Sequence, residues 1–321
     1  MRLGGERLRR LMAATELHLE QVTERAGAPL ALHANATILA GGKRLRPLLV
    51  VLAAESAGGP GDAEESLVRA AVAVELVHSA TLVHDDLIDG AQLRRGHPTV
   101  AAVAGRRLAV ATGDLLFSRA FAELAHNEDA DQLCALSQAS SALAAGELLQ
   151  REDAYAAQVA VERYLHRCEL KTAALFEAAC RLGALVAVEG SRELAEALGA
   201  FARRIGLAFQ MLDDVLDVSG PVERTGKSRG TDLLDGTVTL PFILAREREP
   251  SLARLDLASL GGAEQAEELC ERIAATGALD EAREQALRVV AEAKSALPEI
   301  LPEGRSVLLE LVADAVVERY R

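Results

Sequence analysis

Two runs of aspartate constrain this chain more than any other feature of its sequence. Both have the pattern Asp-Asp-x-x-Asp, and their members are Asp85, Asp86, Asp89, Asp213, Asp214 and Asp217. On a helix, residues i and i+4 share one face with roughly 5–6 Å between their Cβ atoms, so each run holds like charges close together. Gly90 follows the first run and Gly220 the second, which predicts that both lie near helix C-termini, where the macrodipole disfavours anions. Acids clustered there need a cation, and Mg²⁺ shared with a phosphorylated substrate fits because it prefers oxygen ligands.

A solvated acidic helix face is the simpler interpretation of one such run. The segments that precede the two runs, residues 74–83 and 201–212, argue against it because they are apolar enough to be core helices. Charge buried beside such helices is costly unless it is compensated. The repetition of one spacing in two such settings therefore indicates acids that face an interior cavity.

Apolar residues recur at helical spacing over long segments, and the period-2 patterns typical of strands are scarce. The chain has 321 residues, with no dividing linker rich in proline, glycine or serine and no short repeat. We therefore expect an all-α fold formed by a single large helical domain over residues 1–321.

Charge and cysteine content exclude several protein classes. A net charge of −13 argues against nucleic acid as a partner. Four widely spaced cysteines without a Cys-x-x-Cys pair are typical of buried free thiols in a cytoplasmic protein, not of a disulfide or zinc framework. The basic start of the chain has no apolar signal segment, and polar residues interrupt the apolar stretches, so we expect no transmembrane segment.

The few lysines mark candidate phosphate contacts. Arginine is used throughout, whereas lysine occurs only at Lys43, Lys171, Lys227 and Lys294. The first three have glycine, threonine or other cations as neighbours, which suits contact with phosphate. Because lysine presents a compact point charge and arginine a planar fork, the two are not interchangeable at a tight anion site. Chance placement on the surface is a weaker explanation for three of the four lysines.

Further cations lie close to the first acid run. Arg94 and Arg95 follow it within a few residues, where an ordinary helix-dipole contact is the alternative to a diphosphate clamp beside a metal. His78 lies about two helical turns before the run, and a lone histidine there would be a core residue. With Lys43 and Arg46 as partners, we expect His78 to be a third contact to the anion.

The motifs together resemble the trans-isoprenyl diphosphate synthase (polyprenyl synthetase) family, in particular its long-chain members. The resemblance runs from about Gly41 to Pro241 and is specific in the order of its parts. These parts are GGKRLRP at 41–47, the first acid run with the trailing RRG at 94–96, GELLQ at 146–150, KTAALFEAA at 171–179, FQMLDDVLD at 209–217, and GKSRGTDL at 226–233 with TLP at 239–241.

The resemblance implies a fold and a set of metal ligands. The implied fold is a single all-α helical bundle around a deep central cavity, the isoprenoid synthase type I fold, in a homodimer. About three Mg²⁺ ions per active site are implied when substrate is bound, with Asp85, Asp89 and Asp213 as ligands. Asp86, Asp214 and Asp217 are implied to support these ligands, and the expected catalytic set consists of the six acids and Lys171.

The resemblance also implies the substrates, isopentenyl diphosphate and an allylic diphosphate, which condense to an all-trans polyprenyl diphosphate. The residues implied to hold the allylic diphosphate are Arg94, Lys171 and Lys227. Those implied to hold isopentenyl diphosphate are Lys43, Arg46, His78 and Arg95. Thr172 and Gln210 are expected to line the space where the allylic carbocation forms. The sequence departs from the family pattern at Thr237, where the family usually has a lysine. This replacement affects a secondary contact to the diphosphate.

Small residues before the first run suggest a long product. Ala80 and Thr81 lie one turn below the run, and Val77 and Val74 follow further down. A turn rises roughly 5.4 Å, comparable to one isoprene unit, so we expect a product of about six to ten units. Alternatives are a geranylgeranyl- or farnesyl-length synthase and the catalytic subunit of a heteromeric synthase. Release of such a product is compatible with peripheral membrane contact.

Two other classes share some of these features. A terpene cyclase of the same fold would share the first acid run, but it would not need a complete second run or the GGKRLRP segment. A non-catalytic regulatory subunit would be expected to have lost one acid run, and both are intact here. The sequence therefore favours a catalytic prenyltransferase.

Overall fold

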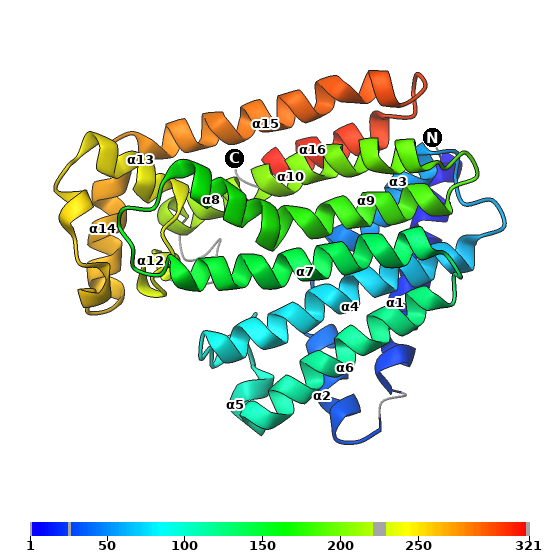
Figure 1. Cartoon of the computed structure of the whole chain (residues 1–321), viewed down its shortest axis with the longest axis horizontal. Helices are drawn as coiled ribbons and strands as arrows, with labels where there is room; N and C mark the ends of the chain where they lie inside the picture. The colour runs from blue at the N-terminus through cyan, green and yellow to red at the C-terminus, as the bar shows by residue number, and fades with distance from the viewer. Residues whose placement is uncertain (1, 25–26, 221–228, 319–321) are drawn as a thin grey trace. The chain divides into compact units, whose positions relative to one another are not determined.

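The computed structural model describes residues 2–24, 27–220 and 229–318 (Figure 1). The prediction of an all-α fold is confirmed. Among these residues the secondary structure is almost entirely helical, and the strands β1 and β2 have only two residues each. The elements up to α7 are α1 (Arg2–Glu24), α2 (Leu30–Leu39), α3 (Leu45–Ser56), α4 (Glu64–Ile88), β1 (Leu93–Arg94), β2 (His97–Pro98), α5 (Val100–Ala104), α6 (Arg106–Ala125) and α7 (Ala130–Glu152). The later elements are α8 (Val161–Cys168), η1 (Glu169–Ala173), α9 (Ala174–Val186), α10 (Arg192–Ser219), α12 (Thr231–Leu234), α13 (Leu240–Arg248), η2 (Leu252–Arg254), η3 (Leu257–Ser259), α14 (Ala263–Ala275), α15 (Ala278–Ile300) and α16 (Val307–Glu318).

The chain forms two compact units. Unit 1 comprises Met1–Ser140, Leu175–Ala200 and Pro298–Leu309. Unit 2 comprises Ser141–Ala174, Phe201–Leu297 and Glu310–Arg321. The first acid run belongs to unit 1 and the second to unit 2. The single domain expected over residues 1–321 stays a prediction.

Helix α4 forms the centre of unit 1. It packs most extensively against α6, which runs alongside it, and also against α3 and α1 (Figure 1). Two glutamates, Glu64 and Glu65, occupy its first turn, where the helix dipole favours negative charge. Almost every residue from Leu67 to Ala80 is buried. The first acid run therefore lies at the C-terminal end of a helix whose preceding turns are buried in the core of unit 1.

Within the described residues, α4 is also long and apolar enough to cross a membrane, judged by length and composition alone. Glu75 and His78, expected to interrupt this stretch, are too few to lower its mean hydropathy below the level of a membrane-spanning helix. Of its most apolar 18 residues, 72 % are buried. An apolar helix that is buried on most sides is typical of a protein core.

The end of α4 fixes the position of the first acid run. Asp89 is the C-cap residue, and Gly90 follows with a φ of +67°, a left-handed conformation that glycine adopts readily. The amide of Ala91 donates to the carbonyl of Asp86 at 2.9 Å, as in a Schellman motif. Asp85 therefore lies in the last turn of the helix, as the sequence predicted.

A short hairpin follows the first acid run. β1 pairs antiparallel with β2, and Arg95 and Gly96 form the two-residue loop with φ values of +53° and +81°. Positive φ at both loop positions is the signature of a type I′ turn. Thr99 fixes the base of the hairpin, because its hydroxyl donates to the carbonyl of Ala91 at 2.7 Å and accepts from the amide of Ala102.

Unit 2 contains a local widening of the helical backbone at η1, which has π-helical geometry. The amide of Ala174 donates to the carbonyl of Glu169, five residues earlier. Gly146 of α7 lies directly against this turn, since a Cβ atom there would come within 2.7 Å of the Lys171 amide nitrogen. Single π turns occur frequently at functional sites.

All four cysteines are free, as the sequence predicted. Cys168, Cys180 and Cys270 are buried as predicted, but the prediction of burial is wrong for Cys134, which is exposed. Burial raises the pKa of each buried thiol, to about 12 for Cys180 and Cys270. These thiols remain protonated and unreactive near neutral pH.

Candidate active site

The first acid run presents its three carboxylates differently. Asp86 is buried, Asp85 is half-buried and Asp89 is exposed. The guanidinium of Arg94 donates to Asp86 at 2.7 Å, and this ion pair connects the hairpin to the last turn of α4. In this structure Arg94, expected to hold the allylic diphosphate, therefore has a carboxylate partner next to the predicted metal ligand Asp85.

A cluster of cations forms beside this run in unit 1. The Arg95 guanidinium lies over the glycine-rich loop, where a Cβ at Gly42 would approach its two terminal nitrogens at 3.0 and 3.4 Å. The Arg46 guanidinium lies 5.0 Å from the centre of the Phe176 ring. Segments about 50 residues apart in the sequence thus converge in unit 1, as expected for Lys43, Arg46 and Arg95.

His78 belongs to the same cluster. Burial lowers its pKa well below the usual 6.5, and Arg46, Arg95, Arg94 and Arg44 lower it further in that order. The imidazole is therefore neutral near pH 7 and can donate one N–H hydrogen bond. The structure brings together Arg46, His78 and Arg95, three of the four residues predicted to bind isopentenyl diphosphate. Their role toward that substrate stays a prediction.

A pocket of about 410 Å³ opens beside the cluster. It is lined by apolar residues of α2, α4 and α5 and by a few polar groups, which include His33, Thr37, Asp86, Arg94 and Arg95. The pocket shares Asp86, Arg94 and Arg95 with the acid run and its hairpin. Part of the charged site is therefore accessible through this pocket within unit 1.

The second acid run carries a hydrogen-bonded chain in unit 2. The Tyr164 hydroxyl donates to one oxygen of Asp214 at 2.6 Å, and the Gln210 amide group donates to the other at 2.7 Å. The Thr172 hydroxyl donates to the Gln210 carbonyl at 2.7 Å. The structure thus brings Thr172 and Gln210 together, and the side-chain carbonyl dipole of Gln210 is engaged by Thr172.

Asp214 is the most perturbed carboxylate of the second run. Burial raises its pKa, the hydrogen bonds from Tyr164 and Gln210 oppose this, Asp213 raises it again, and the outcome is a pKa of about 7. Asp213 and Asp217 are only half-buried. Asp214 is therefore bonded to the side chains of Tyr164 and Gln210, while Asp213, the predicted metal ligand, is the more accessible carboxylate.

Lys171 lies in the π turn and forms an ion pair with Glu147 of α7. Arg151, one turn further along α7, donates to the same glutamate at 3.2 Å. Gly146 lets the backbone of α7 approach Lys171, and Glu147 fixes its ammonium group. Backbone and side chain of the predicted diphosphate ligand are thus both held by the GELLQ segment.

Asp217 anchors the segment that follows α10. The amide of Asp232 donates to an Asp217 carboxylate oxygen at 3.3 Å, and the amide of Gly230 donates to the Asp217 carbonyl at 3.0 Å. Thr237, which replaces the usual lysine, donates its amide to the Asp232 carbonyl at 2.7 Å. Lys227, predicted to hold the allylic diphosphate, lies outside the described residues.

The residues predicted to control chain length lie in the core of unit 1. Val74, Val77 and Ala80 are fully buried, and Thr81 is half-buried with its hydroxyl bonded to the His78 carbonyl at 2.7 Å. Their effect on product length stays a prediction.

The donor set of the two runs fits Mg²⁺. Within the described residues, no three His, Cys, Asp or Glu side chains converge closely enough to form a complete site by themselves. Mg²⁺ is usually held by one or two carboxylates together with water and substrate phosphates, so a complete protein cage is not required. Asp85 and Asp89, one turn apart at the end of α4, provide two hard oxygen donors of this kind.

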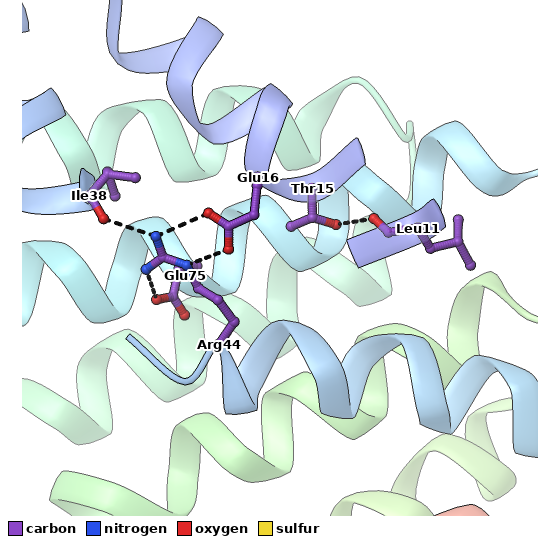
Figure 2. Close-up of polar contacts among 6 residues, drawn as sticks. All are labelled: Leu11, Thr15, Glu16, Ile38, Arg44 and Glu75. Carbon is purple, nitrogen blue, oxygen red and sulfur yellow. Dashed lines mark hydrogen bonds and ion pairs between the residues drawn. The ribbon is translucent and has the colours of Figure 1, made fainter. Parts of the chain in front are cut away.

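Sequence reasoning missed several residues that shape these sites. They are Glu16, Arg44, Glu75, Glu147 and Tyr164. Glu75 carried a signal, since it is a lone acid in an apolar helix and is only 4 % exposed. Its partner is Arg44, at 2.8 Å (Figure 2). The other pairings connect residues far apart in the sequence and had no local signal.

Comparisons with known proteins agree with this geometry. Residues 29–276 match the model of the family described as polyprenyl synthetase. A geranylgeranyl diphosphate synthase of Methanosarcina mazei is 39 % identical over 287 residues, covering 87 % of this chain and 86 % of that protein. Component 2 of a heptaprenyl diphosphate synthase of Geobacillus stearothermophilus is 42 % identical over 241 residues, covering 74 % and 73 %.

The fold is equally close to solved structures. A polyprenyl synthase of Caulobacter crescentus, crystallised with calcium and isoprenyl diphosphate, has 36 % sequence identity and a TM-score of 0.87 over 98 % of each chain. Relatives of this kind are named as synthases of products of different length. Together with the two acid runs and the basic cluster, these likenesses show that the chain belongs to the polyprenyl synthetase family of trans-prenyltransferases.

Proposed function

We propose that this protein uses Mg²⁺ to condense isopentenyl diphosphate with an allylic diphosphate. The observation that carries the proposal is the basic cluster of unit 1. There the loop at 41–46, His78 and the Arg94-Arg95 hairpin gather cations around a neutral imidazole. A diphosphate is the most highly charged part of either substrate, and it suits such a cluster.

In this proposal the metal ligands are Asp85, Asp89 and Asp213. Bound Mg²⁺ supplies Lewis-acid stabilisation of the charge that grows on the leaving diphosphate. The supporting observations are the all-oxygen donor set and the relative from Caulobacter crescentus, which was crystallised with calcium and isoprenyl diphosphate.

The isopentenyl diphosphate is bound by Lys43, Arg46 and Arg95 through charge-assisted hydrogen bonds. The neutral imidazole of His78 adds one N–H donor without adding a further positive charge to a crowded cluster. These contacts orient the double bond of isopentenyl diphosphate toward the allylic carbon. Binding energy is thereby used to hold the two reacting carbons in position.

The allylic diphosphate is held by Arg94, Lys171 and Lys227. Its C–O bond breaks, the isopentenyl double bond forms the new C–C bond, and the proton that is lost passes to the departing diphosphate. Thr172 and Gln210 line the reacting carbons, and the apolar helices around them exclude water that would hydrolyse the cation.

The product proposed is of about six to ten isoprene units, because small residues occupy the turn below Asp85. A geranylgeranyl-length product is the alternative, since one relative is named for it. The likeness to a component 2 favours a second candidate, the catalytic subunit of a heteromeric synthase. A homodimer and a cytoplasmic location complete the proposal, as the sequence analysis expected.

The test is an assay of the purified protein with isopentenyl and farnesyl diphosphates and Mg²⁺, with product length determined by chromatography. We expect successive condensations and a dominant product of about six to ten units. Activity only after addition of a small partner subunit would favour the heteromeric alternative. No condensation under either condition would refute the proposed reaction.

A further inference from the structure

In the sequence, Arg44 lies between Lys43 and Arg46, two residues predicted to bind substrate, but its own side chain bonds within the protein. Its guanidinium donates to Glu16 of α1 at 2.6 and 3.2 Å, to Glu75 of α4 at 2.8 Å, and to the Ile38 carbonyl of α2 at 2.9 Å (Figure 2). Three helices of unit 1 are thus joined at one side chain. With these bonds formed, Arg44 is occupied within the protein, whereas Lys43 is exposed beside it.

The backbone at Arg44 is unusual as well. Its φ is +48°, a left-handed conformation disfavoured for a residue with a side chain. Arg44 is also the N-cap residue of α3, so the loop turns into the helix at this point. The four side-chain hydrogen bonds hold this conformation, and it determines how Lys43 and Arg46 are presented on either side of Arg44.

The charges around Arg44 connect it to the predicted binding site. Burial lowers the pKa of Arg46 to about 10, Glu75 raises it, and Arg95 lowers it. Burial raises the pKa of Glu75, which Arg44 and Arg46 oppose. Glu75 therefore offsets the charge of two arginines at once and is a buried counter-charge of the basic cluster.

Arg46 shows that the cluster is prepared for a further partner. The side chain as a whole is half-buried, but its Nε atom is enclosed and has no hydrogen-bond partner in the described structure. A donor buried in this way is costly unless it is satisfied. An anion bound between Lys43, Arg46 and Arg95 would compensate the charge of this guanidinium.

We propose that Glu16 and Glu75 act through Arg44 as positioning residues for the isopentenyl diphosphate site. Helix α1, which lies outside the family match at residues 29–276, thereby takes part in binding this substrate. The inference rests on the proposed function, because it assigns the basic cluster to isopentenyl diphosphate.

A simple structural connection between α1 and α4 is the alternative, and the chain offers a matched control for it. Glu64 of α4 accepts hydrogen bonds from Arg7 at 3.0 Å and from Arg10 at 2.8 and 2.9 Å, all between the same two helices. This ion pair lies at the opposite end of α4 from the acid run. Glu64→Gln therefore removes an α1–α4 contact without touching the basic cluster.

The test compares steady-state kinetics and thermal unfolding of Glu16→Gln, Arg44→Lys and Glu64→Gln. We expect Glu16→Gln and Arg44→Lys to raise the KM for isopentenyl diphosphate about tenfold, while kcat and the KM for the allylic substrate change less than about twofold. Glu16→Asp should restore most of the affinity. Glu64→Gln should leave all three parameters unchanged at a similar Tm.

Equal KM values for Glu16→Gln and Glu64→Gln would overturn the positioning role while leaving the proposed function intact. A fall in apparent kcat with both KM values unchanged would also overturn it, because partial unfolding lowers the fraction of active enzyme without changing its affinity. Wild-type turnover is measured first, and absence of product would refute the proposed function instead. Calorimetric binding of isopentenyl diphosphate to the same variants then still tests the positioning role.

Discussion

Tyr164 donates a 2.6 Å hydrogen bond to Asp214, the middle acid of the second run. Both side chains are buried, with exposures of 0 % and 3 %. The phenol takes no part in the motifs that identify the family, yet it holds the carboxylate next to the predicted metal ligand Asp213. Its distance of 50 residues from Asp214 in the sequence explains why no local pattern indicated the contact.

The Tyr164–Asp214 contact predicts how stability depends on pH. The folded-state pKa of Asp214 is about 7, above its ordinary 3.8. Between these values the carboxyl stays protonated in the folded state but ionises in the unfolded state, so its contribution to stability is lost as pH rises and levels off above about pH 7. Because the Tyr164 hydrogen bond lowers this pKa, Tyr164→Phe should extend the decline to higher pH.

The measurement is the free energy of unfolding of the metal-free protein as a function of pH. Asp214→Asn is the control, since it removes the titrating group and should remove this part of the pH dependence. Identical curves for Tyr164→Phe and wild type above pH 7 would contradict the prediction.

Metal removal should abolish turnover. Excess EDTA should stop product formation and added Mg²⁺ should restore it. Asp85→Asn and Asp213→Asn should each lower kcat by about 10³-fold or more, because stabilisation of the leaving diphosphate is lost. Unchanged Tm values would show that the variants fold. Substantial turnover in EDTA would exclude a metal-dependent mechanism.

Substitutions of Lys43 and Lys171 should affect different substrates. Lys43→Ala should mainly raise the KM for isopentenyl diphosphate. Lys171→Ala should mainly impair the allylic substrate, since its ammonium is held in the π turn by Glu147 and not in the unit 1 cluster. Initial rates with each substrate varied separately distinguish the two effects. Equal changes in both KM values would indicate a shared pocket.

The fold class and the C-terminal end of α4 were predictable because they depend on local signals. Apolar periodicity predicts helices, and Gly90 after the first run predicts the end of α4. The conformation of Arg44 was not predictable in this way. The left-handed backbone conformation of Arg44, the N-cap residue of α3, is stabilised by Glu16 and Glu75, which are distant from it in the sequence.

The candidate site was predictable by residue type but not by contact. Lys171 was expected at a phosphate, and the structure adds Glu147 as its partner across 24 residues. The pattern Arg94-Arg95-Gly96 suggested a clamp, and the structure shows a type I′ hairpin with Arg94 bonded to Asp86. Such pairings follow from packing, which the sequence of one chain does not encode locally.

Helices α9 and α3 of unit 1 pack so closely at Gly183 that one added methyl group there should lower the stability of the fold. A Cβ at Gly183 of α9 would lie 2.1 Å from the Val50 carbonyl oxygen of α3. Because a backbone atom cannot move aside cheaply, Gly183→Ala should reduce the free energy of unfolding by about 1–3 kcal/mol. Gly5→Ala is the control, since no atom lies within 4 Å of its added Cβ and alanine favours the helix. Chemical denaturation of both variants compares the two, and equal stabilities would contradict the close packing.

The face of α4 below the first acid run should control product length. Ala80 is fully buried one turn before Asp85, so a phenylalanine there would place a ring in the path proposed for the growing chain. The diphosphate contacts are unchanged in Ala80→Phe, and the first condensations should therefore continue. Elongation should stop at about three or four isoprene units, and Val77→Phe, lower on the helix, should stop it about one unit later. Chromatography of the products measures this shift. An unchanged product distribution in both variants would show that the chain does not grow along this face of α4.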